Sequence, residues 1–502
     1  MKTKTLCVTL LSLLAWSSCD LEREDFTEIS PDTFPQTEAD LKLAANALYY
    51  HFASGGWGDD CIYSADYGGY QVLSDLSTDL LWSCWGWESD DIHYHQWYAS
   101  MGGNFANYMY NNFSHYQFLS SARNTIRRIT ASSAPEAAKR LYAAEVHCLR
   151  GWMALYLYDL FGPVPVATDE QLDAPTTYNY LARLSDEEYD EMMETDLRTA
   201  IEDLPEVAEA RGRVTRGAAM MLLLKYYMIR GKWQQAEALA RELYAMEGRV
   251  YALESDYSHL FSKEGMGGSE LILTISASSS TSWLANYMTA EVLPADMPWT
   301  DMSTGWGGYV MPWEFYDTFE AGDSRLACIT TQYTNKYGVL MTSTNSSQLS
   351  YGALPLKYGK DPDMTDAQSG IDLVVYRYAD VLLTLAECIV RNAGVTSEAI
   401  QLVDRVRQRA GLPGLSAEAT ASKEAFLEAL LAERGHEFFL EGLRRQDLIR
   451  FGRYVSSANQ RIASANASGK DYFIVDDSHN RFFIPQTFID ESKSAIKQNE
   501  GY

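Results

Sequence analysis

The chain has 502 residues, of which 46% are hydrophobic, enough to bury the core of one large domain or of roughly two to three ordinary ones. Its 68 acidic residues outnumber its 41 basic residues, and the formal net charge is -27. Nucleic acid and anionic lipid surfaces both require a positive field, so this charge argues against both as partners and leaves neutral ligands open.

Residues 1–18 have the pattern of a secretion signal peptide. Two lysines precede an apolar run over residues 6–16, which is too short to span a bilayer, and two serines follow it. Cys19 comes next, as in a bacterial lipobox, where the cysteine is acylated and tethers the chain to a membrane, although Trp16 departs from the usual pattern. We expect lipidation of Cys19; an ordinary cleaved signal with an incidental cysteine is the alternative.

The stretch that begins at Cys19 is acidic. Residues 20–25 read DLERED and predict a solvated tether, which we place at residues 19–35. In lipoproteins of the Bacteroidetes type, such an acidic start resembles a signal for export to the cell surface.

Cysteine spacing does not indicate a disulfide framework or a zinc cluster. Five cysteines follow Cys19: Cys61, Cys84, Cys148, Cys328 and Cys388. They are few and irregularly spaced. Cys148 and Cys388 lie on apolar helical faces, which is typical of small core residues.

Three aspartates, Asp361, Asp363 and Asp366, are spaced as in a calcium-binding loop. The position at which an EF-hand requires glycine is Asp366 itself, so the pattern is incomplete. We predict no metal site and no cofactor.

Hydrophobic periodicity predicts a helical body. Apolar residues follow three-four spacing over residues 141–156, and Gly162, followed by proline, ends that helix. Residues 378–389 repeat the spacing, and Ser397 is the expected N-cap of a further helix that Gly411 ends.

Two stretches read as similar helical hairpins. Residues 217–245 form a helix, a turn at Gly231 and a second helix, and residues 374–410 do the same around Gly394. Small residues recur where paired helices would approach closely, as in tetratricopeptide repeats. Generic antiparallel helices are the alternative; together the hairpins favour a short superhelix.

Most tryptophans gather in two windows, residues 57–97 and 283–313. Nine of the twelve lie there: Trp57, Trp82, Trp85, Trp87, Trp97, Trp283, Trp299, Trp306 and Trp313. Both windows lack sustained helical periodicity and are rich in Gly, Ser, Asp and Tyr, which indicates loops laid over a scaffold.

Tryptophans on polar loops suit carbohydrate. An aromatic ring offers a flat apolar face to the C–H face of a pyranose, while nearby polar side chains satisfy its hydroxyls. The alternative for any single ring is that it only packs the loop onto the helices.

Several segments, taken in order behind the signal peptide, resemble the SusD/RagB family of outer-membrane glycan-binding lipoproteins. They are RGWMALYLYDLFGPVP at 150–165, YRYADVLLTLAEC at 376–388, ERGHEFFLEGLRRQDLIRFG at 433–452, FFIP at 482–485 and QNEGY at 498–502.

The resemblance implies an all-α fold, with tetratricopeptide-like helical hairpins forming a superhelical scaffold and long irregular loops carrying the ligand site. Residues 36–502 would form a single SusD-like domain. Its expected role is to bind an oligosaccharide or polysaccharide at the cell surface and to deliver it to a TonB-dependent transporter in the outer membrane, without covalent chemistry.

The resemblance also nominates residues in the first tryptophan window. STDLLWSCWGWESDD at residues 77–91 resembles the loop of the starch-binding member of the family in which the second Trp of a Trp-x-Trp pair stacks on sugar. That position is Trp87, with Trp85 as its neighbour and Asp90 in place of an asparagine that contacts hydroxyls. Two extra residues before Trp85 depart from the pattern.

The second tryptophan window, residues 283–313, supplies the residues expected to face Trp87 across the ligand. STGW at residues 303–306 resembles the segment whose tryptophan faces the first across the bound glucan, which nominates Trp306, and Tyr287 takes the place of a third aromatic. We add Trp82 and Trp283 as further ring candidates. No counterpart of the family's ligand-binding arginine is evident, so α-glucan is favoured while fructan, xylan, mannan and host glycans stay open.

Charged residues in the family segments are predicted to form a structural ion network along and between helices. They are Glu433, Arg434, Glu437, Glu441, Arg444, Arg445 and Asp447. A surface glycosidase, which needs two carboxylates across one cleft, and a protein-interaction scaffold are the rival functions.

Overall fold

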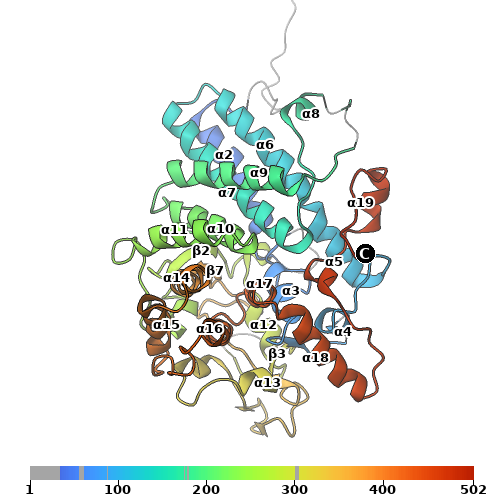
Figure 1. Ribbon diagram of the computed structural model, residues 1–502, viewed down its shortest axis with the longest axis vertical. Helices are drawn as coiled ribbons and strands as arrows, with labels where there is room; N and C mark the ends of the chain where they lie inside the picture. Colours follow the sequence, from blue (N-terminus) through green and yellow to red (C-terminus); the bar gives the residue numbers. More distant parts are fainter. Residues whose placement is uncertain (1–33, 56–60, 87–88, 175, 178–179, 300–304) are drawn as a thin grey trace, which may run out of the picture.

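The computed structural model describes most of the chain (Figure 1). The described residues are 34–55, 61–86, 89–174, 176–177, 180–299 and 305–502. The signal peptide 1–18, Cys19 and nearly all of the tether 19–35 lie outside them. No helix in the described ranges combines the length and the apolar character that crossing a bilayer requires.

Helical hairpins form the scaffold, which confirms the predicted all-α class. Its helices are α2 (Glu38–Tyr49), α5 (Gly103–Ser114), α6 (Tyr116–Ala131), α7 (Glu136–Phe161), α9 (Asp186–Asp203), α10 (Arg216–Ile229), α11 (Trp233–Tyr244), α14 (Tyr378–Ala393), α15 (Ser397–Arg409), α16 (Lys423–Glu437), α17 (Arg444–Arg450) and α18 (Tyr454–Ala467). α7 packs against α2, α6 and α9, and the stack continues through α10, α11, α14 and α15.

Helix boundaries follow the signals in the sequence. α7 ends at Gly162, whose φ of 80° suits glycine, and α10 turns into α11 at Gly231, with a φ of 67°. One prediction was off by a residue. Thr396, not Ser397, is the N-cap of α15, because Thr396 has the extended backbone and its Oγ1 accepts from the amide of Ala399 at 3.2 Å.

Shorter elements lie among the loops. The α-helices are α3 (Tyr70–Leu76), α4 (Ser89–His93), α8 (Asp169–Asp173), α12 (Met288–Val292), α13 (Trp313–Tyr316) and α19 (Gln486–Glu491). The 3-10 turns are η1 (Tyr50–Phe52), η2 (Ser258–Phe261), η3 (Ser282–Leu284), η4 (Ser324–Cys328) and η5 (Asp477–Asn480). The strands are β1 (Trp82–Ser83), β2 (Leu271–Ile275), β3 (Tyr309–Pro312), β4 (Tyr333–Thr334), β5 (Leu340–Met341), β6 (Gly352–Ala353) and β7 (Leu373–Arg377).

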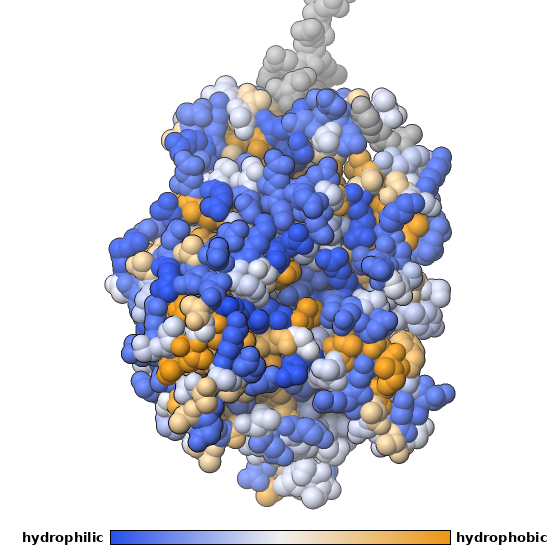
Figure 2. All heavy atoms as spheres, viewed as in Figure 1, coloured by the Kyte–Doolittle hydropathy of each residue, from blue (hydrophilic) through white to orange (hydrophobic). Residues whose placement is uncertain are grey.

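A small sheet joins the two tryptophan windows. Its strand order is β1-β3-β6, and Trp82 of the first window pairs with Val310 of the second. The windows therefore meet in space, beside α12 and below α9, α10 and α11 in the view of Figure 1. Figure 2 shows the upper, helical half of this face covered mostly by hydrophilic residues, as the acidic composition leads one to expect.

The predicted ion network is present and buried. Arg377 of β7 pairs with Glu270 and Glu441, each at 2.8 Å, and also with Glu437. Other ion pairs that the predicted residues form are Arg325–Glu433, Arg434–Asp380, Arg434–Asp447, Arg444–Asp79 and Arg445–Asp159. These charges fasten the loop region to the C-terminal helices, because their partners come from both.

Candidate functional site

Two aromatic rings from separate loop segments stand face to face. The ring centroids of Tyr287 and Trp306 are 5.6 Å apart, and their planes differ by 18°. With Gly55, Ala65 and the turn at residues 366–368, they line a cavity of about 300 Å³. A parallel pair of rings beside a hollow can hold a flat apolar face of a ligand.

The backbone around Trp306 is fastened to the short helix α12. The amide of Trp306 donates to the carbonyl of Ala290 at 2.8 Å, and that of Gly308 donates to Glu291 at 2.7 Å. A Cβ atom at Gly305 would lie 2.0 Å from the carbonyl oxygen of Leu293, so only glycine allows this close approach. The indole is thus carried on a fixed segment.

Trp85 supports the same segment. Its indole Nε1 donates to the backbone carbonyl of Trp306 at 3.3 Å, and its ring lies 5.6 Å from that of Tyr309. A Cβ atom at Gly308 would come within 2.6 Å of the Trp85 ring. Trp85 is partly buried against the core, so it positions Trp306 from behind.

Tyr287 is held at the start of α12. Its hydroxyl donates to the carbonyl of Ser282 at 3.2 Å. The buried side chain of Asn286 accepts from the amide of Met288 at 3.0 Å and donates to the carbonyl of Ile371 at 3.1 Å. These bonds fix the backbone on either side of the Tyr287 ring.

The third wall of the cavity is a tight turn. The amide and carbonyl groups of Thr365 and Gln368 exchange hydrogen bonds of 3.1 and 3.0 Å, and Asp366 has a φ of 52°. The amide of Asn286, the residue before Tyr287, donates to the carbonyl of Ser369, the residue after the turn, at 2.8 Å. This backbone hydrogen bond connects the turn to the segment that carries Tyr287. Sequence reasoning did not assign Gly55, Ala65 or this turn to the site, because no periodicity marks them.

The aspartates considered for calcium have other roles. Asp361 is buried and accepts from the amide of Gly370 at 2.5 Å, with Lys263 at 3.6 Å. Asp366 lines the cavity instead. The described residues contain no cluster of three or more side chains suited to a metal ion.

Trp283 lies beside the site without lining the cavity. It belongs to η3, and half of its side chain is exposed. The hydroxyl of Tyr287 binds the carbonyl of Ser282, which precedes it. The turn that presents Trp283 is therefore tied to the ring that faces Trp306.

The structure does not bring Trp82 and Asp90 to the cavity. The ring of Trp82 lies 4.5 Å from that of His93 and 5.8 Å from that of Tyr94. The carboxylate of Asp90 pairs with the ammonium of Lys470 at 2.8 Å and also accepts from the hydroxyl of Tyr472. Trp87, the ring nominated first from the sequence, lies outside the described residues.

Comparison with known proteins agrees with the resemblance in the sequence. The sequence model of the SusD family matches residues 330–502. SusD-like protein P2 of Formosa agariphila is 25% identical over 523 aligned residues, which cover 99% of each chain. The C-terminal third of the chain thus matches the SusD family, and the sequence is similar to a SusD-like protein over nearly its whole length.

The chain is also similar to other SusD-like proteins in sequence and in fold. The starch-binding protein SusD of Bacteroides thetaiotaomicron is 23% identical over 424 residues, 72% of each chain. Surface glycan-binding protein A from Bacteroides thetaiotaomicron, solved in complex with laminarihexaose, has a TM-score of 0.69 and 22% identity, covering 92% of this chain and 100% of that one. The predicted resemblance to the SusD family is confirmed, and so are the tetratricopeptide-like helical hairpins.

Proposed function

We propose that this protein is a SusD-family glycan-binding protein whose site is the cavity beside Tyr287 and Trp306. The stacked rings carry the proposal, because two parallel aromatic faces at a hollow match the C–H face of a pyranose. The supporting bonds from Trp85, Asn286 and α12 hold both rings in place before a ligand arrives. A preformed platform costs little ordering entropy when it binds.

The site binds without catalysing a reaction. Hydrolysis of a glycosidic bond needs two carboxyl groups that flank it. Among the described residues that line the cavity, Asp366 is the single carboxylate. Other acidic groups of the family segments, such as Glu437 and Glu441, are buried in ion pairs. This supports capture over the glycosidase alternative.

The favoured ligand is starch or another α-glucan. The likeness to a protein named starch-binding supports this choice, together with the placement of Trp306 and Tyr287. A second relative was solved with laminarihexaose, so another glycan is the alternative. Both ligands are chains of sugar rings, for which the same aromatic platform is suited.

The remaining steps concern location and delivery. Lipidation of Cys19 after removal of residues 1–18 would anchor the protein in the outer membrane with the cavity outside the cell. From there it would pass its glycan to a TonB-dependent transporter.

Replacing Cys19 by alanine in the full chain is expected to abolish palmitate labelling and to move the protein out of the membrane fraction. Co-purification of a TonB-dependent transporter with the wild-type protein tests the delivery step.

Calorimetry against a glycan panel tests the binding step. The panel contains starch, other glucans, fructan, xylan, mannan and host glycans. Trp306→Ala is expected to weaken binding by about 30-fold or more, the loss typical of a central aromatic contact. Trp233→Ala is the matched control, since that ring lies on α11 under the guanidinium of Arg391. Equal losses in both variants, or no binding of any panel member, would contradict the proposal.

A further inference from the structure

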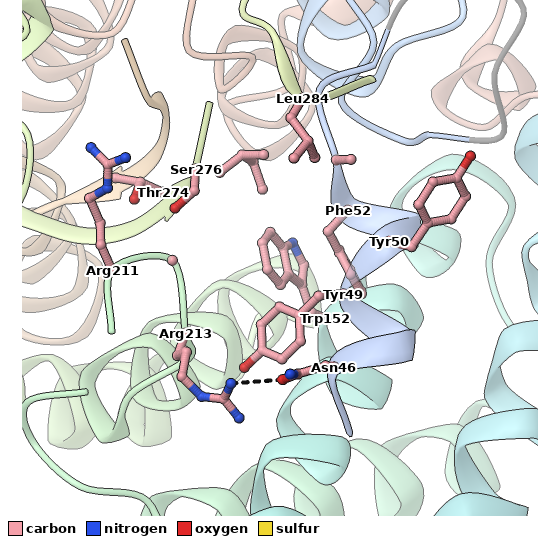
Figure 3. Close-up of a pocket in the computed structure, with 13 residues that line it drawn as sticks. Asn46, Tyr49, Tyr50, Phe52, Trp152, Arg211, Arg213, Thr274, Ser276 and Leu284 are labelled. Carbon is pink, nitrogen blue, oxygen red and sulfur yellow. Dashed lines mark hydrogen bonds between the residues drawn. The ribbon is translucent and has the colours of Figure 1, made fainter. Parts of the chain in front are cut away.

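A second cavity lies beside the first. It has a volume of about 340 Å³. Figure 3 shows the rings of Tyr49, Phe52 and Trp152 on one side of it. On the other side lie Thr274, which belongs to β2, and Ser276, which follows that strand. Leu284 lies at the rim. Its volume is at the low end of the range for small-molecule sites.

The same two chain segments contribute residues to both cavities. Ala53 lines the second cavity and Gly55 the first, while Leu284 lines the second and Tyr287 the first. Because a residue extends at most about 3.6 Å, the paired lining positions are no more than about 11 Å apart along either segment. A short oligosaccharide covers such a distance.

Residues 53–55 and 282–285 of these segments form a wall of the second cavity. Hydrogen bonds hold this wall together, and it exposes apolar side chains. The hydroxyl of Ser54 donates to the carbonyl of Ala285 at 3.1 Å, and the amide of Ser278 donates to the carbonyl of Leu284 at 2.8 Å. Trp283 and Leu284 nevertheless expose 50% and 39% of their surface. Adjacent exposed apolar side chains beside a hollow indicate a contact surface.

Two buried aromatic rings, Phe52 and Trp152, form an apolar lining for the second cavity. Phe52 and Trp152 stack with their centroids 4.2 Å apart. The hydroxyl oxygen of Ser276 is buried and has no hydrogen-bond partner among the residues that the structure describes. An unpaired buried hydroxyl is unfavourable until a ligand group bonds to it.

The two arginines that line the second cavity are each paired with an acidic residue. Arg213 pairs with Glu145 and donates to the side-chain oxygen of Asn46 at 2.8 Å, and Arg211 lies 3.5 Å from Asp372. Each cation already has a carboxylate partner. The cavity is therefore suited to a neutral, hydroxyl-bearing ligand, since a charged one would compete with these pairs.

We propose that the second cavity is a further subsite for the same glycan, which holds a neutral sugar unit beyond the one at Tyr287 and Trp306. The chain of sugars crosses the wall over Trp283 and Leu284, and Ser276 bonds to a hydroxyl of the outer unit. This inference rests on the proposed glycan-binding function. It explains why the protein keeps an exposed leucine at the rim and an unpaired hydroxyl on the opposite side.

Affinity as a function of ligand length tests the subsite. The probes are maltotriose against maltoheptaose and laminaritriose against laminarihexaose, titrated into the purified protein. Ser276→Ala removes an unpaired buried hydroxyl, so its melting temperature should be at least that of the wild type. We expect it to lose about fivefold in affinity for the long probe. Leu284→Ser should lose up to about tenfold. Both should bind the trimer within about twofold of the wild type.

The control is Leu340→Ser, because Leu340 is exposed to a similar degree on the β4–β5 hairpin. It should bind both lengths as the wild type does. If Ser276→Ala and Leu284→Ser bind long and short probes unchanged while Trp306→Ala loses both, the second subsite is wrong and the proposed function stands. If the wild type binds neither series, both proposals are overturned for these glucans.

Discussion

The indole of Trp85 donates its N–H to the backbone carbonyl of Trp306, with 3.3 Å between the two atoms. This bond couples the two tryptophan windows, and it makes Trp85 a support for the ring that we assign to ligand. A single neutral hydrogen bond contributes about 1 kcal/mol net, so Trp85→Phe should weaken glycan binding by about fivefold. Calorimetry with the preferred glycan measures this. Full retention of affinity would show that Trp85 does not position Trp306.

The ring of Tyr287 should contribute more to glycan binding than its hydroxyl does. Tyr287→Phe keeps the face opposite Trp306 and loses only the bond to Ser282, so affinity should fall by about fivefold or less. Tyr287→Ala removes the face and should cost about 30-fold. Tyr337→Ala, at a side chain that is 75% exposed on another turn, should have no effect. A larger loss in the phenylalanine variant than in the alanine variant would refute this assignment.

Glu437 holds the buried ion network together. It contacts Arg325 at 3.0 Å and also pairs with Arg377 and Arg409. Removing one partner from a buried charge network is strongly destabilising, so Glu437→Gln should lower the free energy of unfolding by about 3–5 kcal/mol. Urea denaturation measures the change.

The matched control for that variant is Glu209→Gln, since Glu209 pairs with Lys42 at 3.0 Å on the surface. Exposed ion pairs contribute little, so its unfolding curve should overlay that of the wild type. Equal stability of the Glu437 and Glu209 variants would show that the network is not structural.

Asp75 makes stability depend on pH. Burial raises the pKa of this carboxyl from 3.8 to about 7, with a backbone bond from Gly442 opposing the shift. The unfolded chain releases the proton near pH 4 and the folded chain near pH 7, so this group's contribution to stability falls as pH rises between those values. Asp75→Asn should therefore melt at a higher temperature than the wild type at pH 8 and at the same temperature near pH 4.

Asp79 should behave in the opposite way. Burial raises its pKa, but the guanidinium of Arg444, 2.7 Å away, together with Arg461 and a backbone hydrogen bond, outweighs burial and holds the pKa below its usual value. The stabilisation is present above the unfolded pKa and is lost as pH falls through the lower folded value. Asp79→Asn should thus destabilise at pH 8, and the difference should shrink in acid. The same sign of effect in both variants at pH 8 would contradict the two assignments.

The helical scaffold could be predicted because its information is local. The turn at Gly231 between α10 and α11, and the end of α7 at Gly162, follow from spacing and glycine alone. Thr396 shows the limit of that reasoning. Thr396 and Ser397 are both good N-caps, and only the backbone geometry decides between them.

The site was predicted in part, since it depends on contacts distant in sequence. Trp306 and Tyr287 were nominated from the family resemblance, and they stack. Asp90 was nominated in the same way, yet Lys470 and Tyr472 engage its carboxylate from 380 and 382 residues away. The turn at residues 365–368 completes the cavity through a bridge to Asn286, for which the sequence carries no periodic signal.

A crystal structure with bound maltoheptaose or laminarihexaose, whichever binds in the panel, tests the central claim most directly. We predict a sugar ring at the cavity with its carbon atoms about 4 Å from the faces of Trp306 and Tyr287, the distance of ordinary van der Waals contact. Sugar density on another surface, with these two rings bare, would contradict the assignment of the site.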